Sequence, residues 1–134
     1  MAVKYFTREE AEALLPRVEP LLEELQRLRA VFLEHETSLA AFQEKVMGNG
    51  HLPPAEVVQE REAITETAER MDEILAEINT LGILVKDLDM GLIDFPTLRH
   101  GGEVYLCWRL GENGIGWWHP TDSGFSGRQP IETF

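Results

Sequence analysis

A repeat of apolar residues along the first third of the chain most constrains what this sequence can fold into. Its members follow one another at steps of four and three: Leu14, Val18, Leu21, Leu25, Leu28, Phe32, His35, Leu39, Phe42 and Val46. Steps of this size place every member on one side of an α-helix and form the seam of a coiled coil. The repeat therefore predicts a long helix, and its apolar stripe requires a partner.

A second repeat provides that partner. Its apolar members are Val57, Ile64, Ala68, Met71, Leu75 and Ile78, with Ile74 and Leu81 widening the stripe. Gly48-Asn49-Gly50 ends the first repeat and Leu52-Pro53-Pro54 precedes the second, so both helices have suitable terminal residues. Because the connection is short and the helices would be roughly 45 and 42 Å long, we expect an antiparallel hairpin.

Local signals refine the first helix. Thr7 and Glu10 have the spacing of a capping box, which predicts a helix start directly after Thr7. Pro16 disfavours helical conformation at the residue before it, so a short first helix is expected to bend or stop there.

A histidine occupies one position of the first apolar repeat. We expect His35 to face the middle of the second helix, near Glu62 or Glu66, and to set the register of the hairpin. A polar residue at such a position more often sets register than performs chemistry.

After Gly82 the apolar periodicity changes from helical to two. Expected strands cover residues 83–89, 92–95, 103–110 and 115–119. Pro96 is expected to end the second of these strands. Asn113-Gly114 is the strongest short hairpin signal in the chain and predicts a two-residue type I′ turn.

The turn at Asn113-Gly114 fixes an expected register. It pairs Arg109 with Trp118 and Trp108 with His119, and paired residues share a face of the sheet. Arg109 and Trp118 would then lie together on one face, and His119 would lie on the opposite, apolar face.

These elements predict an α+β fold in a single domain, residues 1–134. A long antiparallel two-helix hairpin, resembling a coiled coil and including a short N-terminal helix, is expected over residues 7–82. A small antiparallel β unit with an irregular tail is expected over residues 83–134.

Charge and composition exclude several function classes. The 134 residues contain 12 Lys and Arg against 24 Asp and Glu, a formal net charge of −12 at pH 7. Such an acidic chain repels phosphate backbones and anionic membrane surfaces, so neither nucleic acid nor a membrane is expected as a partner. No segment approaches the roughly 20 apolar residues of a membrane span. The single Cys107 cannot form an internal disulfide, and we expect a cytoplasmic protein.

Four stretches carry a resemblance to a known family. They are Phe6-Thr7-Arg8-Glu9-Glu10-Ala11 with Leu14-Leu15-Pro16, the run from Val85 to Pro96, Glu103-Val104-Tyr105-Leu106-Cys107-Trp108, and Trp118-His119 with Gly124-Phe125-Ser126-Gly127-Arg128. In these stretches the chain resembles the bacterial domain of unknown function 2203 family. The resemblance implies a small bacterial cytoplasmic protein with this order of helices and strands, and it implies no activity and no catalytic residue.

Four residues of the β unit have the side chains of a divalent metal site: Asp87, Asp89, Asp94 and His119, with Asp122 nearby. Carboxylate oxygens and imidazole nitrogens are ligands for hard and borderline divalent ions. The alternative is that the acids solvate an exposed strand face and protect a sheet edge. His119 likewise has the alternative role of a hydrogen-bonded core residue. We expect these acids to lie scattered, because nothing in the sequence forces separate strands to converge.

Three other residues are candidates for ligand binding. Arg109 beside Trp118 would form a cation–π pair that presents a flat charged surface to a carboxylate or phosphate. Arg128, flanked by glycine, is expected to be the more exposed anion-binding residue. In both cases the alternative is structural, either packing of the arginine stem or an ordinary tight turn. Cys107 is expected to be buried and inert rather than a nucleophile.

The preferred functional hypothesis is a non-enzymatic interaction module that self-associates. It rests on apolar residues outside the main seam, which require a further covering surface: Leu15, Leu22, Val31, Leu33 and Val58. A homo-oligomer, and a protein partner for the β unit, are therefore expected. The alternative is a small metal- or metabolite-binding protein, with a hydrolase as one version, whose site lies on the β unit.

Overall fold

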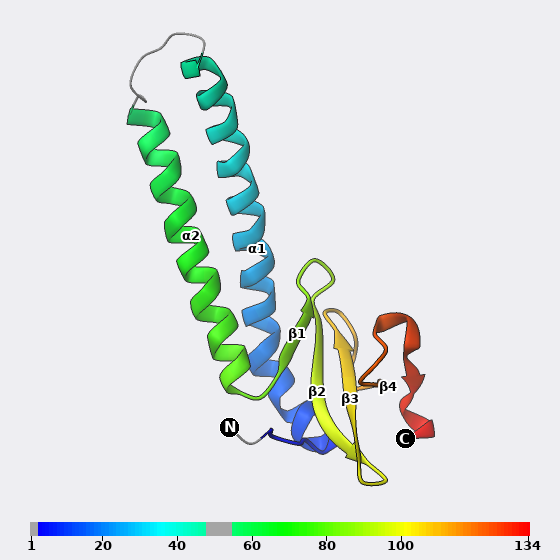
Figure 1. The fold of residues 1–134 in the computed structure, drawn as a ribbon. Helices are drawn as coiled ribbons and strands as arrows, with labels where there is room; N and C mark the ends of the chain where they lie inside the picture. The colour runs from blue at the N-terminus through cyan, green and yellow to red at the C-terminus, as the bar shows by residue number, and fades with distance from the viewer. Residues whose placement is uncertain (1–2, 48–54) are drawn as a thin grey trace. The chain divides into compact units, whose positions relative to one another are not determined.

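The computed structural model describes residues 3–47 and 55–134 (Figure 1). In chain order the elements are helices α1 (Arg8–Met47) and α2 (Ala55–Thr80), strands β1 (Leu84–Asp87), β2 (Leu92–Arg99), β3 (Gly102–Arg109) and β4 (Trp117–Pro120), the 3-10 helix η1 (Phe125–Gly127), strand β5 (Gln129–Pro130) and the 3-10 helix η2 (Ile131–Thr133). The predicted α+β fold, two long helices followed by an antiparallel sheet, is confirmed. The predicted connection through Gly48-Asn49-Gly50 and Leu52-Pro53-Pro54 lies outside the described residues.

Helix α1 continues through Pro16, so the predicted stop at this residue is wrong. The capping box is formed, with the Glu10 amide donating to the Thr7 hydroxyl at 3.1 Å and the Thr7 amide donating to the Glu10 carboxylate at 3.0 Å. An internal proline costs a helix about 3 kcal/mol, whereas burying one leucine or valine contributes roughly 1.5–3 kcal/mol. Leu15 and Val18, on either side of Pro16, are both buried. Their burial offsets the cost of the proline.

The chain forms two compact units. The helical unit covers Glu24–Ile74, and the sheet unit combines Met1–Glu23 with Leu75–Phe134. No described helix is long and apolar enough to cross a membrane.

In the helical unit, His35 pairs with Glu60, whose carboxylate oxygen lies 2.6 Å from the histidine Nδ1. The predicted partners Glu62 and Glu66 are wrong. Glu60 lies one helical turn after the buried Val57 and is itself half-buried, whereas Glu62 and Glu66 are exposed. The apolar seam therefore turns Glu60, and not the other two, toward α1.

The sheet unit contains a five-stranded antiparallel sheet in the order β1-β2-β3-β4-β5. Alternate residues of its strands point to opposite faces. One face, here named the Phe95 face, carries the buried apolar residues Ile93, Phe95, Leu106 and Trp108. Phe95 meets Phe6 edge to face, with ring centroids 5.3 Å apart. The other face, named the Asp94 face, carries Asp94 and Cys107.

Strand β2 was predicted to end at Pro96, but it continues to Arg99. A proline has no backbone N–H to donate, so it fits a strand only at a position where no neighbouring strand offers a carbonyl to that N–H. Strand β1 pairs with β2 no further than Asp94. Beyond that point the edge of β2 is open, and there the Pro96 carbonyl accepts the Phe6 amide at 2.8 Å.

The predicted register of β3 and β4 is wrong. Trp118 pairs with Leu106 rather than Arg109, and His119 pairs with Tyr105 rather than Trp108. The displacement is three positions, an odd number, so every β4 side chain changes face. Trp118 therefore lies on the Phe95 face and His119 on the Asp94 face.

The cause of this shift is a wide turn between β3 and β4. Positive φ occurs at Gly111 (103°) and Gly114 (81°) but not at Asn113, so the type I′ geometry is not formed. Glu112 holds the wide turn, because its carboxylate accepts the Arg109 amide at 2.6 Å and its carbonyl accepts the Trp108 indole at 3.1 Å.

A two-residue hairpin turn occurs instead between β2 and β3. Arg99 pairs with Gly102, and the two intervening residues, His100 and Gly101, have φ of 52° and 80°. Positive φ at both central positions is the requirement of a type I′ turn.

Replacing Leu22 with alanine tests the core of the sheet unit. Leu22 is fully buried, so Leu22→Ala should lower the free energy of unfolding by about 2–5 kcal/mol. Leu98 is a matched control in the same unit, because it is 49% exposed and Leu98→Ala should cost under about 1 kcal/mol. Urea unfolding of the three proteins measures both values, and equal losses would contradict the burial of Leu22.

Candidate functional site

Three potential ligand side chains meet on the Asp94 face of the sheet: Asp94 of β2, Cys107 of β3 and His119 of β4. Asp94 lies directly opposite Cys107 in the strand pairing. A carboxylate oxygen, the thiol sulfur and an imidazole nitrogen all lie within 4.8 Å of one another. The three residues, named the Asp94–Cys107–His119 cluster, are at most 1% exposed.

The imidazole of His119 is held at both ends. Its Nδ1 lies 2.8 Å from the carbonyl oxygen of Pro120. A carbonyl only accepts, so Nδ1 carries a hydrogen and donates it. The Nε2 atom lies 3.0 Å from each carboxylate oxygen of Asp94. The ring therefore joins β4 to β2 across the intervening β3, and its Nε2 edge faces the cluster.

The thiol of Cys107 is poorly suited to nucleophilic chemistry. Burial, together with the negative charge of Asp94, raises the pKa of Cys107 to about 12, and the nearby Arg128 only partly opposes this. A thiol with this pKa is almost entirely protonated at neutral pH. The expectation that Cys107 is buried and not a nucleophile agrees with this environment.

Tyr105 and Lys86 cover the histidine. The rings of Tyr105 and His119 meet edge to face, with centroids 5.4 Å apart. The ammonium of Lys86 lies 4.6 Å from the centroid of the Tyr105 ring. Burial, with smaller contributions from Glu103 and Asp94, raises the pKa of Tyr105.

Arg128 lies beside the cluster, where its guanidinium is held by hydrogen bonds and by aromatic rings. Its two terminal nitrogens donate to the two carboxylate oxygens of Glu112 at 3.0 and 2.6 Å, and one also donates to the Cys107 carbonyl at 3.3 Å. The guanidinium carbon lies 5.0 Å from the ring centroids of both Trp117 and Phe125. The expectation of an exposed arginine is wrong, because this side chain is only 9% exposed.

The predicted pair of Arg109 with Trp118 is not formed. Arg109 lies on the Asp94 face, with its guanidinium 5.8 Å from the Phe125 ring centroid. Trp118, on the Phe95 face, is instead covered by Arg99 at 4.5 Å, and its indole donates to the Thr133 hydroxyl at 2.9 Å. The register shift therefore removes the flat binding surface that these two residues were expected to make.

The predicted metal ligands divide into two groups. Asp94 and His119 come together, whereas the other acids of the set do not join them. Asp87 accepts the Met90 amide at 3.0 Å and so stabilises the turn between β1 and β2. Asp87, Asp89 and Asp122 are not members of the cluster, and Cys107 takes the place the sequence hypothesis gave to them.

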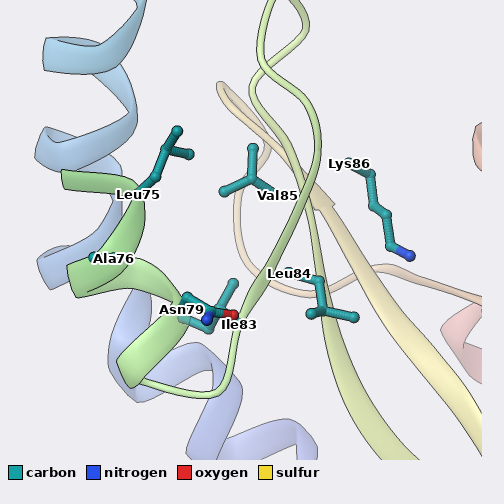
Figure 2. Close-up of a pocket in the computed structure, with 7 residues that line it drawn as sticks. All are labelled: Leu75, Ala76, Asn79, Ile83, Leu84, Val85 and Lys86. Atoms are coloured by element: carbon teal, nitrogen blue, oxygen red, sulfur yellow. The ribbon is translucent and has the colours of Figure 1, made fainter. Parts of the chain in front are cut away.

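A hollow of about 430 Å³ lies in the sheet unit between the end of α2 and β1 (Figure 2). Figure 2 shows Leu75 and Val85 pointing toward each other across it, while Lys86 extends away from the helix. Its lining residues are Leu75, Ala76, Asn79, Ile83, Leu84, Val85 and Lys86. This lining is mostly apolar and includes no member of the cluster, so the potential for chemistry lies in the cluster rather than in this hollow.

Comparison with known protein families identifies the chain. The family described as uncharacterized conserved protein (DUF2203) matches residues 4–131, nearly the whole sequence. The chain belongs to this family. The resemblance seen in the sequence motifs is thereby confirmed. Comparison with curated proteins and with solved structures gives no match.

Glu112 is a residue that sequence reasoning missed. Its carboxylate binds Arg128 and its backbone holds the indole of Trp108, so it fixes the turn beside the cluster. A sequence signal for the cluster itself was present in Asp94, an acid within the otherwise apolar run from Leu92 to Pro96. A buried acid requires hydrogen-bond partners, and the His119 ring lies within hydrogen-bond distance of both carboxylate oxygens.

Removing the carboxylate of Asp94 tests the cluster. Asp94→Ala leaves the buried imidazole of His119 without the carboxylate it faces, so the free energy of unfolding should fall by about 3–5 kcal/mol. Asp122→Ala is the control, because Asp122 is exposed and its loss should change little. Urea unfolding in the presence of a chelator measures both, and a loss for Asp94→Ala no larger than for the control would contradict the buried pair.

Proposed function

We propose that this protein binds one transition-metal ion of the Zn²⁺ class through Asp94, Cys107 and His119. The observation that carries this proposal is the convergence of three different ligand atoms, from three strands, within 4.8 Å of one another. Such convergence needs a specific register of β2, β3 and β4, and a shift of one residue in any of them would remove it.

The spacing of the donors suits a small tetrahedral ion. Ligand atoms at Zn–N, Zn–O and Zn–S distances of about 2.0–2.3 Å lie about 3.3–3.6 Å apart. The Nε2 of His119 and the carboxylate of Asp94 are 3.0 Å apart, so they need to separate only slightly. The most distant pair, at most 4.8 Å apart, needs to approach by about 1 Å.

The hydrogen bond from His119 to Pro120 also favours metal binding. A metal-ligating histidine nearly always donates its second ring N–H to a carbonyl or carboxylate, which fixes the tautomer and the ring orientation. The 2.8 Å contact of Nδ1 with the Pro120 carbonyl has this form. It leaves Nε2, facing Asp94, as the ligand atom.

The donor types select the class of ion. Mg²⁺ and Ca²⁺ prefer oxygen ligands, and the cluster would offer such an ion a single carboxylate. A thiolate and an imidazole suit Zn²⁺ and its neighbours. Coordination deprotonates a thiol, so the charges of Asp94 and the Cys107 thiolate would balance a divalent ion.

Metal titration tests the proposal. Protein stripped with a chelator should bind one equivalent of Zn²⁺ in isothermal titration, and Co²⁺ should give a thiolate-to-cobalt charge-transfer band. His119→Ala and Cys107→Ser should weaken binding at least about 100-fold, since even outer-shell partners contribute 10- to 100-fold. Mg²⁺ should give no comparable heat.

Asp87→Ala is the matched control for that experiment. It removes an aspartate of the same sheet that lies outside the cluster, and it should retain full stoichiometry and the cobalt band. An unmodified protein that binds no Zn²⁺, or an Asp87→Ala variant as defective as His119→Ala, would overturn the proposal.

Self-association is a second proposal, and fewer residues support it than the sequence analysis expected. Leu15 and Leu22, two of the residues expected to need a covering partner, are buried within the sheet unit itself. Leu33 and Val58 of the helical unit are each 47% exposed. These two residues are what still favours an interface between copies of the chain.

Sedimentation equilibrium at micromolar concentration tests the second proposal. The unmodified protein should sediment as a dimer or larger oligomer, and Leu33→Glu with Val58→Glu should give a monomer, because charges at an apolar interface oppose association. Leu98→Glu, an exposed leucine of the sheet unit, is the control and should leave the mass unchanged. A monomeric unmodified protein would refute self-association.

A further inference from the structure

The cluster is closed to solvent. Asp94, Cys107 and His119 are at most 1% exposed, so neither an ion nor a reagent reaches them unless part of the sheet unit opens. The segments that surround the cluster differ in how firmly they are held. An ion or reagent should enter the cluster where the least firmly held of these segments opens.

On one side the cluster is covered by Tyr105 and Lys86. Tyr105 belongs to β3 and Lys86 to β1, and both strands pair with β2. Tyr105 also lies within the ladder that joins β3 to β4. Opening this side would break the sheet itself, which is a global rather than a local event.

On the other side lies the C-terminal strap, residues 123–130, whose Arg128 donates to the Cys107 carbonyl and lies 5.0 Å from the Trp117 ring centroid. Two of its backbone hydrogen bonds are local, from Gly127 to Gly124 and from Arg128 to Phe125. Its strand β5 has only two residues, which pair with Trp117 and Trp118. The strap therefore has little backbone pairing to the sheet, and its attachment depends on side chains.

Arg128 provides the main side-chain attachment. It forms the two-pronged hydrogen bond to Glu112, donates to the Cys107 carbonyl and lies between the rings of Trp117 and Phe125. Its Nε, however, is buried without a hydrogen-bond partner among the described residues. An unsatisfied buried donor opposes burial, so this clamp is weaker than its other contacts suggest.

We propose that Arg128, clamped by Glu112, is the gate of the Asp94–Cys107–His119 cluster: release of this pair lifts the C-terminal strap and gives access to the three ligand atoms. The gate's role in ion exchange rests on the proposed metal site. The opening itself is a property of the metal-free protein and is measured without an ion.

Cys107 is the single cysteine of the chain, so its labelling rate reports opening directly. Chelator-treated protein is mixed with an aromatic disulfide reagent under native conditions. Cys107 forms a mixed disulfide with the reagent, and the aromatic thiol that the reagent releases is followed by absorbance. Arg128→Lys keeps the positive charge but loses the two parallel hydrogen bonds to Glu112, and Glu112→Gln keeps the shape but loses the negative charge. Each should accelerate labelling about 10- to 100-fold, the range expected for losing a hydrogen bond to a charged group.

Arg99→Lys is a matched control. Arg99 also covers an indole, that of Trp118 at 4.5 Å, donates to the carbonyl of Thr133 at 3.1 Å and has a buried Nε without a partner among the described residues. It lies on the Phe95 face, away from the cluster. Its labelling rate should stay within about twofold of the unmodified protein, since it holds no cover over Cys107.

The outcomes separate the gate from the metal site. Unchanged labelling in both Arg128→Lys and Glu112→Gln, or equal acceleration in Arg99→Lys, would overturn the gate even if Zn²⁺ binds stoichiometrically. Accelerated labelling in a protein that binds no Zn²⁺ would support the gate and refute the metal proposal. In Zn²⁺-loaded protein, the same two variants should release the ion to a chelator faster. In Co²⁺-loaded protein they should retain the charge-transfer band, which a change of ligands would not do.

Discussion

The hydrogen bonds of Glu112 determine which side chains of the sheet meet. Its carboxylate accepts the Arg109 amide and the Arg128 fork, and its carbonyl accepts the indole of Trp108. These contacts hold the chain in a wide turn where a tight hairpin was expected. Because the resulting displacement of β4 is odd, His119 lies on the face of Asp94 and Cys107. With the tight turn, His119 would lie among apolar residues and the cluster would not exist.

Features that depend on nearby residues could be predicted from the sequence. The apolar repeats gave two helices, the Thr7–Glu10 capping box gave the start of the first, and the change of periodicity after Gly82 gave the sheet. Features that depend on distant contacts could not. Glu12 accepts the Ile115 amide although 103 positions separate them, and this contact fixes the wide turn from outside it. No local pattern around Asn113-Gly114 reveals it.

For the same reason, the residues of the candidate site could be predicted in part, but their grouping could not. Asp94 and His119, two candidates chosen by side-chain type, come together in the structure, but their grouping requires the register of three strands. The register error separated His119 from Cys107, and Asp87 and Asp89 were included because carboxylates are the ligand type that divalent ions accept. Arg128 was misjudged because the preceding Gly127 suggested exposure, whereas its guanidinium contacts Glu112 and two aromatic rings.

Stability alone is a weak reason for such a cluster. Replacing a buried ion pair by apolar residues of similar volume is often neutral or stabilising, because desolvation cancels much of the attraction. The neighbouring strand positions Ile93, Phe95 and Leu106 show that this sheet readily accepts apolar side chains. A carboxylate, a thiol and an imidazole at one point therefore need a further reason. The imidazole's Nδ1 is already held by a carbonyl and its Nε2 faces Asp94, an arrangement that suits the proposed metal site.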